Sequence, residues 1–267
     1  MTPPGIALQL WTVRERYDTE PDEVLARVAE MGYPAVETVY SRTGGRTHEA
    51  QREALDRHGL AAPSMHAFID ELEDDLDGVI GAARAQGAEY VVCAWVGPER
   101  RQTAADYQDL ARSLAGIGER CRDAGLQLCY HHHDFELAEA GGRRGMEWIW
   151  EGVDAELLKA EVDVYWVDVA GLDPVAYLQA LGERCVLLHC KDRARPGTPP
   201  LAGAGEGLAS ENAEVGAGVL DFPALLAAAP HARWLVTEQD FSAGDPLDSA
   251  EVSLRAVQRL LAPEAAA

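Results

Sequence analysis

The stretch LKAEVDVYWVDVAGLDPVAYLQALGERCVLLHCKD, residues 158–192, contains the pattern that decides the fold. Two short apolar runs, Leu158–Asp163 and Cys185–Cys190, are typical of buried strands. Between them Pro174–Leu181 has a helical pattern, and Gly182 follows it where a residue with a left-handed backbone is favoured. A strand, a helix and a second strand in this order predict a parallel βαβ unit.

The same alternation continues outward to both ends of the chain. Six further strands are predicted at Ile6–Leu10, Ala35–Val39, Ala61–His66, Tyr90–Trp95, Leu126–His131 and Trp234–Glu238. Helical patterns between them include Asp22–Met31, Thr47–His58, Ala104–Ala124, Phe222–Ala229 and Ser249–Leu261. Eight such units without a break in composition predict a single domain, residues 1–267, folded as a (β/α)8 TIM barrel. The Gly-, Ala- and Pro-rich segment at about 195–218 is expected to be a long loop, either a functional lid or a flexible insertion.

The amino-acid composition limits the kinds of partner that the protein is expected to bind. Lys and Arg number 23 and Asp and Glu 45, so the formal charge is −22. This charge opposes binding to nucleic acid or to an anionic membrane, although it permits a small phosphorylated ligand in a cleft that contains a local cation. The five cysteines are odd in number and form no CxxC pair, which favours buried, reduced thiols. Because no signal peptide or long apolar segment is apparent, we expect a cytoplasmic protein.

Polar residues follow the later strands, at the end of a parallel barrel where chemistry is usually found. Asp163, His189 and Glu238 come at the ends of three consecutive strands. Any one carboxylate there could simply cap the next helix. Together, two carboxylates and an imidazole suit one divalent ion such as Mn2+, Co2+, Mg2+, Fe2+ or Zn2+.

Three adjacent histidines end the fifth strand. Since side chains alternate along a strand, His131 and His133 share one face, which could look into the barrel, while His132 points to the other. Glu136 follows closely. The pattern indicates a polar site at this strand end, with His132 in a structural role.

The motifs LQLWTVRER, MGYPAVE, YHHHDFE, VDVYWVDVAGLDPVAYL, LLHCKD, VGAGVLDFPALL and VTEQD resemble the sugar phosphate isomerase/epimerase family of xylose isomerase-like TIM barrels. The resemblance implies one divalent metal ion held by Asp163, His189, Glu238 and a fourth ligand. At the fourth position His131 stands where epimerases have a glutamate, so His131 or Glu136 would complete the set. Ala217 also departs from a glutamate that is frequent in relatives.

The resemblance further implies proton abstraction next to a carbonyl, through an enediolate that the metal ion stabilises. Glu238 is the candidate base, and His131, His133 or Glu136 is its candidate acid/base partner. Isomerisation or epimerisation of a sugar or keto-polyol is the first hypothesis. Elimination of water, as in inosose dehydratases, or of a keto-glycoside's leaving group is the second. A non-catalytic sugar-binding or accessory subunit is a third.

Further residues are candidates for substrate binding. Trp11, Trp95 and Trp166 could form an apolar wall against a sugar, or simply pack in the core. Polar candidates are Glu37, His66, Lys191, Asp192 and, by position in the family, Arg195. The expected ligand is a sugar or inositol derivative, and a homo-oligomer or a related partner subunit stays open. The apurinic endonucleases share the fold, but Trp166 and Ala202 to Ala204 stand where they require metal ligands.

Overall fold

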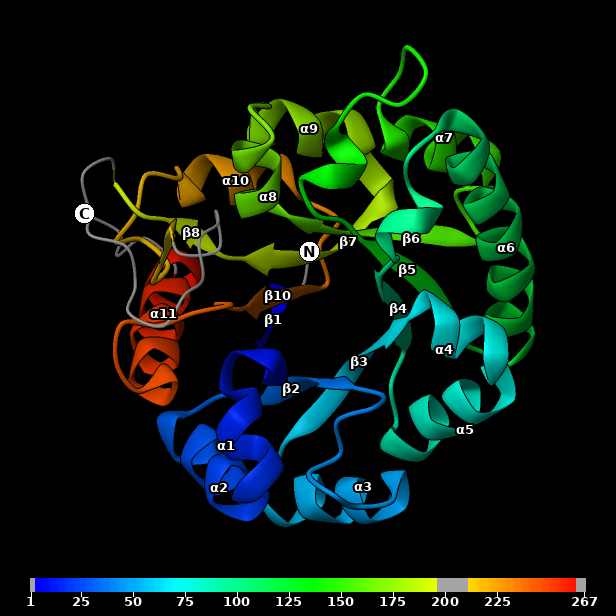
Figure 1. Ribbon diagram of the computed structural model, residues 1–267. Helices are drawn as coiled ribbons and strands as arrows, with labels where there is room; N and C mark the ends of the chain where they lie inside the picture. The colour runs from blue at the N-terminus through cyan, green and yellow to red at the C-terminus, as the bar shows by residue number, and fades with distance from the viewer. Residues whose placement is uncertain (1–2, 196–210, 263–267) are drawn as a thin grey trace.

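The computed structural model describes residues 3–195 and 211–262. Eight parallel strands close into a barrel in the order β1-β10-β7-β6-β5-β4-β3-β2, and helices surround it (Figure 1). The barrel strands are β1 (Gly5–Gln9), β2 (Ala35–Val39), β3 (Ala61–Phe68), β4 (Tyr90–Trp95), β5 (Gln127–His131), β6 (Leu158–Asp163), β7 (Cys185–Cys190) and β10 (Trp234–Thr237). The predicted TIM barrel is confirmed.

The α-helices are α1 (Arg14–Thr19), α2 (Pro21–Met31), α3 (His48–Arg57), α4 (Ile69–Asp74), α5 (Leu76–Gln86), α6 (Ala104–Asp123), α7 (Gly145–Gly152), α8 (Val164–Val169), α9 (Pro174–Leu181), α10 (Phe222–Ala228) and α11 (Pro246–Leu261). Short 3-10 turns lie at Leu10–Val13, Pro98–Arg100, Phe135–Leu137 and Gly182–Arg184. Helix α11 begins three residues before the predicted start, because Asp245 caps it by accepting a hydrogen bond from the Leu247 N–H (2.9 Å). After α2, Gly32 adopts the expected left-handed conformation, with φ 99°.

The predicted loop at 195–218 is only partly described, since residues 196–210 lie outside the described part of the chain. Beyond them, β9 (Asn212–Ala213) pairs antiparallel with β8 (Asp192–Arg193), and the long loop as a whole stays a prediction. The carboxylate of Asp192 organises the returning chain. It accepts hydrogen bonds from the N–H groups of Gly216 and Gly218, both at 2.9 Å.

Strand alternation divides the barrel side chains into two sets. Outward-facing side chains pack against the helices in two large apolar clusters, and they include Leu8, Val36, Met65, Val91, Leu128, Val162, Leu188 and Leu235. Inside the barrel, Ala7, Ala35 and Val236 form one apolar layer, and Leu187, Cys129 and Val92 contribute to another. These inward positions repeat every two residues, so the next inward residues along the strands face the mouth of the barrel.

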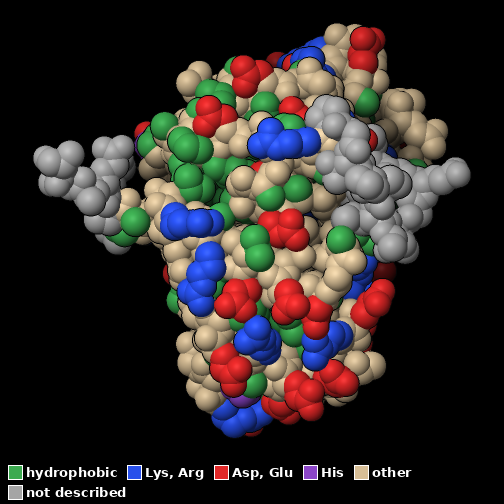
Figure 2. All heavy atoms as spheres, turned by 90° about the vertical axis from the view of Figure 1, so that its left-hand side faces the viewer, with side chains coloured by type: hydrophobic (Ala, Val, Ile, Leu, Met, Phe, Trp, Pro, Cys, Tyr) green, Lys and Arg blue, Asp and Glu red, His purple; other side chains and the backbone are tan. Residues whose placement is uncertain are grey.

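The outer surface mixes charges of both signs. On the face seen in Figure 2, acidic and basic side chains are interspersed. Among the ion pairs between helices, Arg27 of α2 lies 3.0 Å from Glu251 of α11. No helix in residues 3–195 and 211–262 combines the length and apolarity needed to cross a bilayer. All five cysteines are free and buried, as expected: Cys93, Cys121, Cys129, Cys185 and Cys190.

Candidate metal centre and active site

Polar side chains take over the inward positions near the carboxyl ends of the strands. Gln9, Glu37, His131 and His189 each follow an apolar inward residue by two positions. The group also includes Ser64, His66, Glu161 and Asp163, and every member is at least nine-tenths buried. Burial of so many polar groups costs free energy unless they are mutually paired, so their contacts decide what the site can do.

Glu37 is at the base of this site. Its Oε1 accepts a hydrogen bond from the side-chain amide of Gln9 (2.7 Å) and lies 2.8 Å from His189 Nε2 and 2.9 Å from His66 Nε2. Its Oε2 accepts a hydrogen bond from the Ser64 hydroxyl. Although burial favours the neutral acid, His66 and His189 hold the pKa of Glu37 well below its usual range. This carboxylate is therefore a buried anion beneath the imidazoles.

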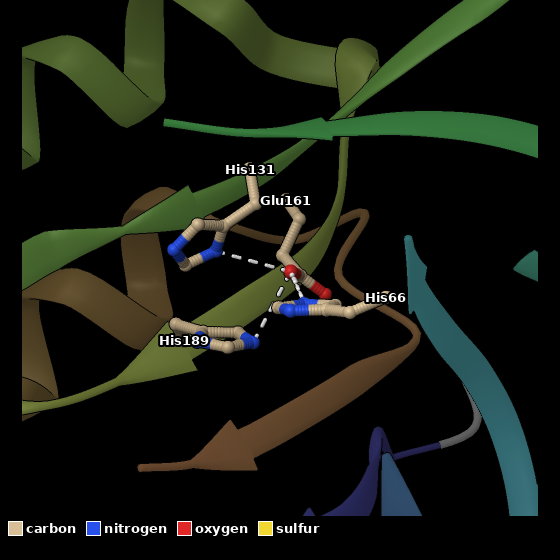
Figure 3. A group of neighbouring side chains, drawn as sticks. All are labelled: His66, His131, Glu161 and His189. Atoms are coloured by element: carbon tan, nitrogen blue, oxygen red, sulfur yellow. Dashed lines mark hydrogen bonds and ion pairs between the residues drawn. The ribbon is translucent and has the colours of Figure 1, made fainter. Parts of the chain in front are cut away.

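Glu161 of β6 brings three imidazoles together (Figure 3). Its Oε2 lies 2.6 Å from His66 Nε2, 3.1 Å from His131 Nδ1 and 3.1 Å from His189 Nε2. Its other oxygen is buried and has no hydrogen-bond partner among the described residues. We call Glu37, Glu161 and His66 the floor of the site.

The mouth group consists of His131, Asp163, His189 and Glu238. Each offers one donor atom, and these atoms all lie within 4.8 Å of one another. His189 Nδ1 is 3.0 Å from Glu238 Oε2, and His131 Nε2 is 3.9 Å from Asp163 Oδ2. Burial and the neighbouring cationic groups lower the pKa of His131 well below its usual value, so its imidazole is neutral, as a metal ligand must be. Two imidazoles and two carboxylates fit a divalent transition metal ion.

Asp163 is both a helix cap and a member of this group. Its Oδ1 accepts hydrogen bonds from the N–H groups of Tyr165 (2.9 Å) and Trp166 (3.3 Å). These hydrogen bonds cap the N-terminus of α8. The cap fixes the side chain and directs Oδ2 toward Lys191 Nζ, 3.2 Å away. Of the two alternatives left open by the sequence, Oδ1 fulfils the helix cap, and metal binding through Oδ2 stays a prediction.

Lys191 is a buried cation surrounded by carboxylates. Besides Asp163, its Nζ lies 2.8 Å from Glu238 Oε2 and 2.9 Å from Asp240 Oδ2. Burial opposes its charge, but these three anions raise the pKa of Lys191 well above its usual value. The same ammonium helps to keep the pKa of Glu238 below its ordinary value, so that carboxylate is ionised at neutral pH.

The histidine run alternates as predicted. His131 and His133 face the cavity, whereas the buried ring of His132 packs edge-on against Tyr177 of α9. Glu136 lies apart from the mouth group. Its oxygens accept hydrogen bonds from the Tyr130 hydroxyl (3.0 Å) and the His133 N–H (2.8 Å). Of the two candidates for the fourth ligand, the structure brings His131 to the other three.

A cavity of about 500 Å3 opens above the mouth group. Its described lining is Trp11, Arg14, Val39, His66, Phe68, Ala94, Trp95, His131, His133, Phe135, Trp166, Lys191, Glu238, Asp240 and Phe241. Six of these residues are aromatic, and the charged groups gather at one end, so the cavity offers an apolar wall and a polar base.

Some of the predicted substrate-binding residues line the cavity, and others do not. Trp11, Trp166, His66 and Lys191 line it. Glu37 is fully buried in the floor, and Arg195 is exposed and outside the described lining.

The structure also adds residues that the sequence analysis did not single out. Glu161 lies two positions before Asp163 on the same face of β6, so strand alternation is the signal that could have revealed it. Asp240 follows Glu238 by two positions, and its contact with Lys191 has no local sequence signal.

Comparison with known proteins agrees with this architecture. A family model described as xylose isomerase-like TIM barrel matches residues 25–259. The chain belongs to the xylose isomerase-like TIM barrel family. The resemblance inferred from the sequence motifs is therefore confirmed.

Three similar proteins match this chain over most of its length. The rhizopine catabolism protein MocC of Rhizobium meliloti is 27% identical over 280 residues, which cover 92% of this chain and 83% of MocC. A sugar phosphate isomerase/epimerase from Parabacteroides distasonis has a similar structure, with TM-score 0.79, 19% identity, and coverage of 98% of this chain and 96% of that one. The IOLI protein, solved with a bound zinc atom, gives TM-score 0.74 and 12% identity, with coverage of 96% and 98%.

Proposed function

We propose that this protein is a divalent-metal-dependent isomerase or epimerase that removes the α-proton of a keto-sugar or keto-polyol. The observation that carries the proposal is the position of Glu238. Its carboxylate is a member of the mouth group and also lines the cavity. A base is thereby held at the boundary between the candidate metal ligands and the space available to a substrate.

Asp163, His131, His189 and Glu238 would hold the ion. When bound, the ion supplies Lewis-acid polarisation of a substrate carbonyl and its neighbouring hydroxyl. The solved IOLI protein, which shares the fold, carries a zinc atom. The mixed nitrogen and oxygen donor set admits Mn2+, Co2+, Mg2+ or Zn2+ alike.

The residues of this chain supply the proton transfer. The Glu238 contacts with His189 and Lys191 both use Oε2, so we assign the other oxygen to the substrate proton. The electron pair left on the α-carbon moves toward the carbonyl, giving an enediolate. His133 lines the cavity, so it is our candidate for returning a proton.

The cavity wall supports a polyol as the substrate class. Trp11, Trp95 and Trp166 line the cavity, and aromatic rings suit the C–H face of a sugar or inositol ring. Asp240 and Lys191 stand at the polar base, where hydroxyl groups need partners. A keto-sugar or keto-inositol would meet both requirements.

Elimination of water or of a glycosidic leaving group is the second candidate. It is favoured by an asymmetry of the mouth group. His131 stands where the epimerases of the resemblance have a second glutamate, and the Lys191 ammonium lies 2.8 Å from the proposed base. One carboxylate with a neighbouring cation suits abstraction of a proton on one side and charge stabilisation of a departing oxygen.

The test is a screen of keto-inositols, 3-keto-glycosides and ketoses in D2O, read by proton NMR with Mn2+ or Co2+ present. Loss of an α-proton signal reports proton abstraction, and the product spectrum separates isomerisation, epimerisation and elimination. Glu238→Gln is expected to bind the substrate but to stop deuterium incorporation.

Full exchange in Glu238→Gln, or unchanged exchange after verified chelation, would remove this mechanism. Elemental analysis of the purified protein addresses the non-catalytic alternative, since an inert sugar-binding subunit would contain no stoichiometric metal.

A further inference from the structure

Two imidazoles of the mouth group each face in two directions. His189 presents Nδ1 to Glu238 at the mouth (3.0 Å) and Nε2 to Glu37 in the floor (2.8 Å). His131 presents Nε2 toward Asp163 (3.9 Å) and Nδ1 to Glu161 (3.1 Å). Both rings therefore have one nitrogen in each layer of the site.

A neutral imidazole carries one N–H and one lone pair, so only one of its nitrogens can bind a metal ion. A carboxylate accepts hydrogen bonds and, when ionised, offers none. When an ion binds at the mouth it takes one lone pair from each ring, so the remaining proton of each ring lies on the floor nitrogen, which faces a carboxylate oxygen. The lone pairs of His131 Nε2 and His189 Nδ1 are then directed at the mouth.

We propose that Glu161 is a positioning residue that selects these tautomers and so prepares the mouth group for its ion. This inference rests on the proposed function, because it assumes that the ion is held at the mouth. Glu161 is the better candidate than Glu37 because its Oε2 contacts both shared imidazoles as well as His66. Figure 3 shows this oxygen between the three rings.

The floor has a donor arrangement that needs no ion. His66 Nε2, His131 Nδ1 and His189 Nε2 supply three N–H donors, and Glu37 and Glu161 supply the acceptors. A competing arrangement would place the ion among His66, His131, Glu161 and His189, whose donor atoms also lie within 4.8 Å. It requires the opposite tautomer in both shared rings, so tautomer state distinguishes the two.

The expected effect of Glu161→Gln follows from the same geometry. The amide has no charge, and its NH2 group competes with the ring N–H groups for the space at Oε2. Loss of an outer hydrogen-bond partner of a metal-bound histidine typically weakens metal binding about 10- to 100-fold. Glu136→Gln is the comparison variant, because this buried carboxylate contacts Tyr130 and His133 instead.

The experiment combines two readouts on the full-length protein. Zinc affinity and stoichiometry are measured by chelator competition for wild type, Glu161→Gln and Glu136→Gln. Long-range 1H–15N spectra of zinc-loaded wild type report the ring tautomers, assigned with single His→Asn variants. We expect one zinc per chain, Nδ1–H in His131 and Nε2–H in His189, a 10- to 100-fold weaker affinity in Glu161→Gln, and less than a threefold change in Glu136→Gln.

The possible failures are distinguishable. If wild type binds zinc but Glu161→Gln binds it equally well, the positioning role is refuted and the proposed function survives. Reversed tautomers in wild type would place the ion in the floor and also refute it. If wild type binds no zinc, manganese or cobalt, the proposed function falls together with this inference. Because the tautomer measurement uses wild type, misfolding of a variant does not remove the test.

Discussion

The variant Glu136→Gln tests whether Glu136 is a buried carboxylic acid that lies outside the mouth group. The Glu136 side chain is fully buried, and burial raises its pKa to about 7 from 4.5, although hydrogen bonds from the His133 N–H and the Tyr130 hydroxyl favour the anion. The folded protein therefore binds a proton that the unfolded chain releases between these pH values. A raised carboxyl pKa contributes stability that is present below pH 4.5 and is lost as the pH rises to about 7.

The magnitude follows from the two pKa values. With a pKa of about 7 in the folded protein and 4.5 in the unfolded chain, linkage gives a contribution from Glu136 of roughly 3 kcal/mol at pH 5 and almost none at pH 8. Gln can accept from the His133 N–H and donate to the Tyr130 oxygen without titrating. The free energy of unfolding of Glu136→Gln relative to wild type should therefore rise by roughly 2–3 kcal/mol between pH 5 and pH 8.

The assay is urea unfolding of both proteins, free of metal, at several values between pH 5 and pH 8. Taking the difference between variant and wild type cancels groups that titrate equally in both. Glu139→Gln serves as the control, because Glu139 is exposed three residues further along. A pH-independent difference for Glu136→Gln, or an equal trend in Glu139→Gln, would refute the assignment of Glu136 as a buried acid outside the mouth group.

Three further predictions concern the mouth group and the cavity. Asp163→Asn should weaken Mn2+ binding by more than the ~10- to 100-fold expected for loss of an outer hydrogen-bond partner. The circular dichroism spectrum should stay unchanged, because the amide oxygen still caps α8. Wild-type affinity in isothermal titration would contradict this prediction. Lys191→Met leaves the buried Asp163 and Glu238 and the partly buried Asp240 without their cation. The metal-free unfolding free energy should therefore fall by about 3–5 kcal/mol, and Mn2+ should restore part of it. An unchanged urea midpoint would oppose this pairing. Trp11→Ala should raise KM about three- to tenfold with little change in kcat, and a loss confined to kcat would place Trp11 in the chemistry instead.

The barrel was predictable from the sequence because its signals are local and repeated. Apolar runs such as Leu158–Asp163 and Cys185–Cys190 are confirmed at their predicted ends. Strand ends of a parallel barrel converge on one mouth, and this topology alone brings Asp163, His189 and Glu238 together. The fourth position could not be chosen, because His131 ends β5 and Glu136 follows in a 3-10 turn whose direction depends on its contacts with Tyr130 and His133.

Other features depend on contacts that local sequence does not encode. Helix α8, VYWVDV, is rich in β-branched and aromatic residues that favour strands, and it is helical because the Asp163 side chain caps it. Glu161 stands within a run interpreted only as an apolar strand, and its role depends on imidazoles that come from three other strands. The β8–β9 pair is organised by Asp192 across more than twenty residues.

The most direct test of the proposed metal centre is anomalous diffraction from crystals grown with manganese. We expect one anomalous peak per chain within bonding distance of His131 Nε2, Asp163 Oδ2, His189 Nδ1 and the Glu238 carboxylate. A well-ordered site with no peak among these four donors, or a peak bound by Glu161 and His66 instead, would contradict the account.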